Sequence, residues 1–136
     1  KDFINAQKMF FVATAPKDGR INLSPKGLEG LKIKNNNTLL WINYFGSGNE
    51  TAAHLLEDDR MTLMMCAYEG EPKIMRIYAK VRVIQEKDEE WNEYINEFDK
   101  TDLLGTYFQQ PALLYHDGLR LLHARLLFYW RWLLAF

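Results

Sequence analysis

Two short stretches of the chain hold residue types that bind an anionic ligand. In FGSGNETAAH, residues 45–54, two glycines, Ser47, Asn49 and Thr51 stand at the start of a segment with helix-forming composition. The first amides of a helix are unpaired and carry a partial positive charge, which suits a phosphate group. Ser47 and Glu50 also have the spacing of a capping box, in which side chains satisfy those amides. From the spacing alone, capping is favoured over phosphate binding.

The second stretch is INLSPKG, residues 21–27. Alternation along a strand places Asn22 and Ser24 on one face, and Lys26 follows just beyond. The amide and the hydroxyl can hydrogen-bond a flat heteroaromatic ring, and the lysine can meet an anion. An exposed strand face that ends in a proline turn is the simpler explanation. The chain has no Walker lysine motif and no G-x-G-x-x-G, which excludes P-loop and Rossmann nucleotide sites.

The remaining reactive residues predict no further site. His54, His116 and His123 lack the spacing of metal ligands, so we expect no metal. Cys66 lies in an apolar run and is expected to pack as a small hydrophobic residue. No catalytic side chain can be assigned, because the members of a catalytic triad assemble in space and not in sequence.

Length and composition indicate one globular domain. The 136 residues suffice for a single core, and we expect one domain over 1–136, with 101–136 left open between the barrel and a partner contact. The net charge of -1 gives no field that favours nucleic acid or a membrane surface. The single cysteine fits a reducing compartment, and we expect a cytoplasmic protein. Residues 1–11 lack the features of a signal peptide.

The stretch 119–136 has about the length of a membrane helix but contains three arginines and a histidine. Such residues are costly at the centre of a bilayer, so we reject a transmembrane span. A surface-lying amphipathic helix stays open, but a buried terminal strand or a segment that contacts a second subunit is favoured.

Periodicity and turn residues predict an alternating order of elements. We expect helices over 2–9, 50–59 and 87–100, and strands over 10–15, 20–24, 38–45, 60–68 and 73–85, with a looser segment over 25–33. Strands joined by tight turns favour an antiparallel sheet, and closing a small barrel removes its edges. The predicted fold is mainly β with flanking helices, an antiparallel β-barrel. Arg76, Lys80 and Arg82 form a basic strand face that we expect to be solvated.

Three longer segments, MFFVATAPKDGRINLSPKG, LLWINYFGSGNETAAHLLEDDRMTLMMCAYEG and KIMRIYAKVRVI, together resemble the pyridoxamine 5'-phosphate oxidase-related family. The resemblance covers about residues 6–98. It implies an FMN-binding split β-barrel that forms a homodimer with the flavin at the subunit interface.

The resemblance also implies roles for particular residues. The FMN-binding positions of the family fall on Asn22, Ser24, Lys26, Ile42, Asn43, Ser47, Gly48, Asn49 and Thr51. True oxidases carry an Arg-Lys pair after the serine of the phosphate turn, where this chain has Gly48-Asn49-Glu50. The segment LLHARLLFY resembles their Arg-Leu-His-Asp-Arg segment, and it makes His123 and Arg125 candidate substrate-binding residues.

The implied function is that of a flavoprotein, an oxidoreductase that acts on an unidentified small molecule. Two alternatives stay open. One is a split-barrel protein that binds flavin, deazaflavin or haem without turnover, and the other is a dimeric scaffold without a cofactor.

Overall fold

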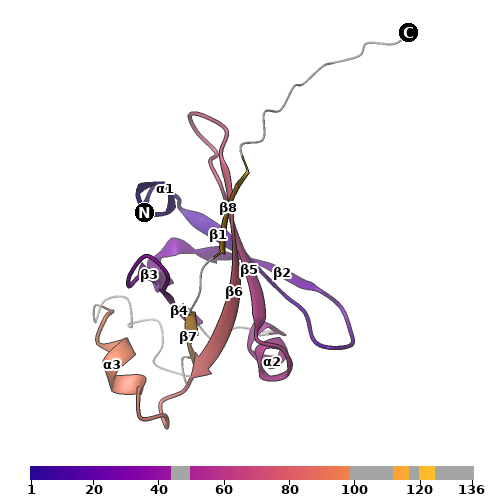
Figure 1. The fold of residues 1–136 in the computed structure, drawn as a ribbon, viewed down its shortest axis with the longest axis vertical. Coiled ribbons are helices and arrows are strands. Elements are labelled where there is room, and N and C mark those ends of the chain that lie inside the picture. The colour runs from indigo at the N-terminus through magenta and orange to yellow at the C-terminus, as the bar shows by residue number, and fades with distance from the viewer. Residues whose placement is uncertain (44–49, 99–111, 117–119, 125–136) are drawn as a thin grey trace.

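The computed structural model describes residues 1–43, 50–98, 112–116 and 120–124. In chain order, the elements are α1 (Asp2–Asn5), β1 (Met9–Thr14), β2 (Asn22–Gly27), the 3-10 turn η1 (Leu28–Gly30), β3 (Leu31–Ile33), β4 (Leu39–Asn43), α2 (Glu50–Glu57), β5 (Arg60–Cys66), β6 (Ile74–Ile84), α3 (Trp91–Ile95), β7 (Ala112–His116) and β8 (Arg120–Ala124). In Figure 1, α2 and α3 flank the strands near the same end of the sheet.

The strands form one antiparallel sheet in the order β2-β1-β5-β6-β7-β4-β3, and β8 also pairs with β6. The first part of β6 pairs with β8 and its last part with β7, so this strand of 11 residues joins both halves of the sheet. Among the described strands no pairing joins β2 to β3, so the sheet curves without closing. This arrangement confirms the predicted antiparallel split barrel.

The main core lies on the inward side of β1, β5 and β6. Phe10 is completely buried, and its ring meets Trp41 of β4 edge-on, with ring centroids 5.7 Å apart. Ile4 of α1 and Leu55 of α2 complete this cluster. The alternation of buried and half-buried residues along β1 follows from the pleat of a strand with one covered face.

A second cluster lies on the other side of β4, where α3 packs. Its buried members are Leu40, Ile42, Ile84, Trp91, Tyr94 and Phe98. Lys34 fastens α3 at the surface, with its Nζ 3.1 Å from Glu93 and 4.5 Å from the centre of the Tyr94 ring. The periodicity that predicted a helix within 87–100 thus corresponds to a packed face.

The boundaries differ from the predicted ones at several places. The helix expected over 2–9 ends at Asn5, and the one expected over 87–100 is five residues long in α3. The segment expected to be loose from residue 25 begins instead as the second half of β2. Pro25 is accepted there because β2 is an edge strand, where a missing N–H can face solvent.

The terminal part of the chain contributes two strands to the sheet. β7 lies between β4 and β6, and β8 pairs with the beginning of β6. The predicted terminal strand within 119–136 corresponds to β8. In the described ranges, no helix has both the length and the apolar character that crossing a bilayer requires.

Candidate functional site

A chain of polar side chains connects β2 to the first turn of α2. Ser24 Oγ donates a hydrogen bond of 3.0 Å to Asn22 Oδ1, and Asn22 Nδ2 donates one of 3.0 Å to Thr51 Oγ1. Thr51 is 1% exposed, so its hydroxyl depends on this partner. The fold therefore brings together three of the residues nominated from the sequence, although 29 positions separate Asn22 from Thr51.

The register of β1 and β2 explains why these side chains face α2. Asn22 lies opposite Thr14, and Lys26 lies opposite Phe10. Directly opposed residues share one face of a sheet, so the polar side of β2 continues the buried side of β1. Lys26 Nζ lies 5.5 Å from the ring centre of Trp41, close enough for a cation–π contact from β2 to β4.

A second polar contact holds α2 against β1. Thr14 Oγ1 lies 3.1 Å from His54 Nδ1, and Thr14 is 3% exposed. His54 follows Thr51 by about one helical turn, so both project from the same side of α2. From the sequence, His54 was excluded as a metal ligand and given no other role, and Thr14 received no role. The inward position of Thr14 in the alternating segment FFVAT is the signal that could have identified it.

Replacing His54 with Asn and, in a second variant, with Gln is expected to show which ring nitrogen makes the contact with Thr14. The Asn amide can take the place of Nδ1, whereas the Gln amide takes that of Nε2, so only His54→Asn preserves the contact with Thr14. Losing the contact leaves a buried hydroxyl unsatisfied, which costs about 1–3 kcal/mol of unfolding free energy. Urea denaturation measures the difference, and equal stability of the two variants would contradict this role of Nδ1.

β4 presents its two nominated residues to opposite sides. Ile42 is completely buried in the cluster under α3, so only its backbone can contact a ligand on the other side. Asn43 is 2% exposed and shares the Trp41 side of the strand. His123 lies in β8 opposite Met75. The remaining nominated residues, Ser47, Gly48, Asn49 and Arg125, lie outside the described residues.

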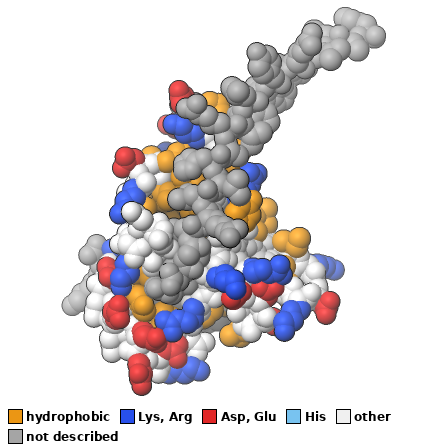
Figure 2. All heavy atoms as spheres, viewed as in Figure 1, with side chains coloured by type: hydrophobic (Ala, Val, Ile, Leu, Met, Phe, Trp, Pro, Cys, Tyr) orange, Lys and Arg blue, Asp and Glu red, His pale blue; other side chains and the backbone are white. Residues whose placement is uncertain are grey.

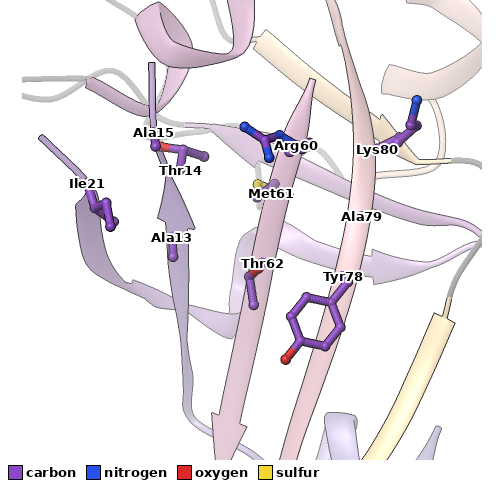
Figure 3. Close-up of a pocket in the computed structure, with 10 residues that line it drawn as sticks. All are labelled: Ala13, Thr14, Ala15, Ile21, Arg60, Met61, Thr62, Tyr78, Ala79 and Lys80. Carbon is purple, nitrogen blue, oxygen red and sulfur yellow. The ribbon is translucent and has the colours of Figure 1, made fainter. Parts of the chain in front are cut away.

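A hollow of about 660 Å³ lies on the outer face of the sheet, which we define as the side of β1, β2, β5 and β6 opposite the core. Ala13 and Thr62, opposed in register, supply small side chains at its centre. Figure 3 shows them between Ile21 on one side and Tyr78 on the other. This hollow is therefore on the opposite face from Asn22 and Ser24.

The two cations that line the hollow are already paired. Arg60 Nε lies 2.9 Å from both carboxylate oxygens of Asp58, and Lys80 Nζ lies 3.7 Å from Asp59. The side-chain hydrogen bond from Arg60 lowers the pKa of Asp58 from 3.8 to about 2. Within the described ranges, no cluster of His, Cys, Asp and Glu side chains is arranged to hold a metal ion.

Comparison with known proteins finds relatives that are similar in sequence and others that share the fold. The family model described as pyridoxamine 5'-phosphate oxidase matches residues 1–121. A curated protein of Aspergillus flavus, the pyridoxamine 5'-phosphate oxidase family protein ustO, is 35% identical over 108 residues, which cover 77% of this chain. The match covers 43% of that relative, so the chain spans less than half of its length.

Two solved structures share the fold at low sequence identity. HutZ, the haem storage protein of Vibrio cholerae, is 18% identical with a TM-score of 0.66, covering 90% of this chain and 89% of its own. An FMN-binding protein of Syntrophomonas wolfei subsp. wolfei is 14% identical with a TM-score of 0.62, covering 90% and 83%. At these identities the likeness establishes a common architecture.

Proposed function

This chain belongs to the pyridoxamine 5'-phosphate oxidase family, and from that premise we propose that it binds FMN and acts as a flavin-dependent oxidoreductase. The observation that carries the proposal is the hydrogen-bonded chain from Ser24 through Asn22 to Thr51. It gathers amide and hydroxyl groups from β2 and α2 where the family resemblance expects the flavin.

The residues present fit the polar parts of FMN. Amides and hydroxyls offer both donors and acceptors, which suit the edge of the isoalloxazine ring and the ribityl chain. Lys26 adds a positive charge on the same face of β2. We assign Asn22, Ser24 and Asn43 to the ring or ribityl chain, and Lys26, Ser47, Asn49 and Thr51 to the phosphate.

A bound flavin would supply hydride and electron transfer, and the protein would supply binding and orientation. The contacts of Thr51 and His54 hold α2 in place, so the polar groups need not reorganise when a ligand arrives. Trp41 beneath Lys26 keeps water from one side of the ammonium group, which strengthens its interaction with an anion. The polar chain contains no carboxylic acid or thiol, so we assign no acid or base.

We further propose that the protein forms a homodimer in which the second subunit covers the outer face of the sheet. Ile21, Leu23 and Tyr78 are 76%, 60% and 45% exposed there. Figure 2 shows exposed hydrophobic side chains beside lysines and arginines on the surface. Exposed apolar side chains gathered on one face are typical of a protein interface. A homodimer packed on this face accounts for its exposed apolar side chains, whereas the hollow lies on the opposite face from the flavin-binding residues Asn22 and Ser24.

Binding without turnover is the second candidate, and the departure at Gly48-Asn49-Glu50 favours it. Gly48 and Asn49 stand where true oxidases have the two cations, and Glu50 adds an acid, which weakens the attraction for a phosphate. HutZ, which shares the architecture, is described as a haem storage protein. A haem carrier on this barrel is therefore the specific alternative.

Titration of the purified protein with FMN, riboflavin and haem tests the proposal. We expect FMN fluorescence to be quenched, with FMN bound about tenfold or more tightly than riboflavin because the phosphate adds charge-assisted contacts. Reduction of the bound flavin by NADH or NADPH without oxygen would favour an enzyme over a carrier. Binding of haem with no quenching of FMN would overturn the flavin proposal.

A further inference from the structure

Four polar side chains join α2 to the neighbouring strands β1 and β2. Thr14 and Asn22 lie directly opposite each other in the register of these strands. Thr14 Oγ1 lies 3.1 Å from His54 Nδ1, and Asn22 Nδ2 donates a hydrogen bond of 3.0 Å to Thr51 Oγ1. Because Thr51 and His54 are three positions apart on a helix, they face the same way and the two contacts lie next to each other. We call these four side chains the α2 clamp.

The apolar packing of α2 is narrow within the described residues. The helix spans eight residues, and an isolated helix of that length is marginal in water. Its buried residues are Thr51 and Leu55, and the neighbouring Leu56 is 76% exposed. Leu55 anchors the helix without determining how it is oriented, since apolar contact is non-directional. The orientation of α2 therefore depends on the directional contacts of the α2 clamp.

The two contacts of the α2 clamp differ in their relation to the flavin site. Asn22 and Thr51 belong to the polar chain that we assign to the flavin. Thr14 and His54 lie outside that chain, and Thr14 is 3% exposed. Without their contact, the hydrogen bonds of the α2 clamp hold the helix at its first turn alone. The contact of Thr14 with His54 therefore fixes the direction in which the first turn presents its polar groups.

We propose that Thr14 and His54 are positioning residues that determine how strongly the site prefers a phosphorylated flavin, without touching the flavin themselves. The inference rests on the proposed function, which assigns Thr51 to the phosphate. Gly48-Asn49-Glu50 supplies no cation, so recognition of the phosphate relies more on neutral donors. Hydrogen bonds from such donors weaken steeply when their angle changes. A displaced α2 would thus lose affinity for the phosphate, while the contacts of β2 with the ring would remain.

The affinities for FMN and riboflavin, both measured by fluorescence quenching, separate this role from a general loss of stability. Thr14→Val removes the hydroxyl and keeps the shape of the side chain, and His54→Gln removes the group at the Nδ1 position. We expect each variant to lower the ratio of FMN affinity to riboflavin affinity about three- to tenfold, which corresponds to one hydrogen bond. The affinity for riboflavin should stay near the wild-type value. A wild-type ratio in a folded Thr14→Val protein would overturn the inference.

Conservative variants and a matched control complete the comparison. Thr14→Ser and His54→Asn keep the contact and should keep the wild-type ratio. Thr38→Val removes a hydroxyl from another residue that is 3% exposed, immediately before β4, and should also leave the ratio unchanged. The inference is wrong if Thr38→Val lowers the ratio as much as Thr14→Val, or if Thr14→Ser lowers it equally.

The double variant Thr14→Val/His54→Gln tests whether the two residues act through one contact. It should lower the ratio no further than either single change, because each change already removes that contact. In the flavin-free protein, amide hydrogen exchange along α2 should be faster in Thr14→Val and unchanged in Thr38→Val. Additive losses in the double variant, or wild-type exchange in Thr14→Val, would contradict the inference.

The wild-type protein distinguishes failure of the proposed function from failure of this inference. If it binds FMN no more tightly than riboflavin, the assigned phosphate contacts are wrong, and the inference fails with them. If it prefers FMN and the variants at Thr14 and His54 show the same preference, the inference alone is overturned.

Discussion

Replacing Phe10 with alanine is expected to lower the free energy of unfolding by about 3–5 kcal/mol. Phe10 is completely buried, and its ring packs edge-on against Trp41 across the inside of the barrel. Truncation removes the transfer free energy of the ring and leaves a cavity between strands that cannot collapse freely. The loss is a large part of the whole stability of a domain of ordinary size.

Phe11 is the matched control, because it follows Phe10 and points to the outer face, where it is half-buried. Phe11→Ala should cost clearly less in urea denaturation at low protein concentration. At high concentration the two losses should approach each other if a second copy covers the outer face, since dimer formation stabilises the folded chain by mass action. Equal losses at every concentration would contradict the inward and outward assignment along β1.

Sequence patterns predicted the order of the first elements because their causes are local. The turn PKDG between two β-rich runs corresponds to the connection between β1 and β2, which pair directly. The 11 residues of β6 alternate between covered and exposed positions in most of the strand, which agrees with the strand expected over 73–85. These features depend on residues that are close together in the sequence, so the sequence alone predicts them.

The features that sequence did not predict depend on distant neighbours. β7 takes its place between β4 and β6 by pairing with residues far back in the chain, and its own sequence has no signal for that position. α3 ends at Ile95 although Phe98 of the same amphipathic pattern is still buried in the cluster, so the covered positions continue past the last helical residue. Local periodicity indicates a helix but does not locate its ends.

The candidate site also has one part that local sequence predicts and another that depends on contacts between distant residues. The common face of Asn22 and Ser24 follows from alternation and could be predicted. Their link to Thr51 and the contact of Thr14 with His54 require the packing of α2 on two strands, which no spacing encodes.

Replacing Asn22 with leucine is expected to weaken FMN binding by about tenfold to 100-fold. Asn22 is the centre of the polar chain, accepting from Ser24 and donating to Thr51, so its loss leaves both hydroxyls without this partner. Each hydrogen bond contributes about 0.5–1.5 kcal/mol net, and 1.4 kcal/mol corresponds to tenfold in affinity. Ser24→Ala breaks one bond and should cost about tenfold or less.

Asn36→Leu is the control for the exchange itself, because Asn36 is exposed in the turn between β3 and β4. It should leave the affinity for FMN at the wild-type value. Fluorescence quenching measures binding, and urea denaturation of the flavin-free protein shows whether each variant still folds. A folded Asn22→Leu protein with wild-type affinity for FMN would contradict flavin binding at β2. A site that uses Asn22 as donor and acceptor must lose binding free energy when both groups are removed.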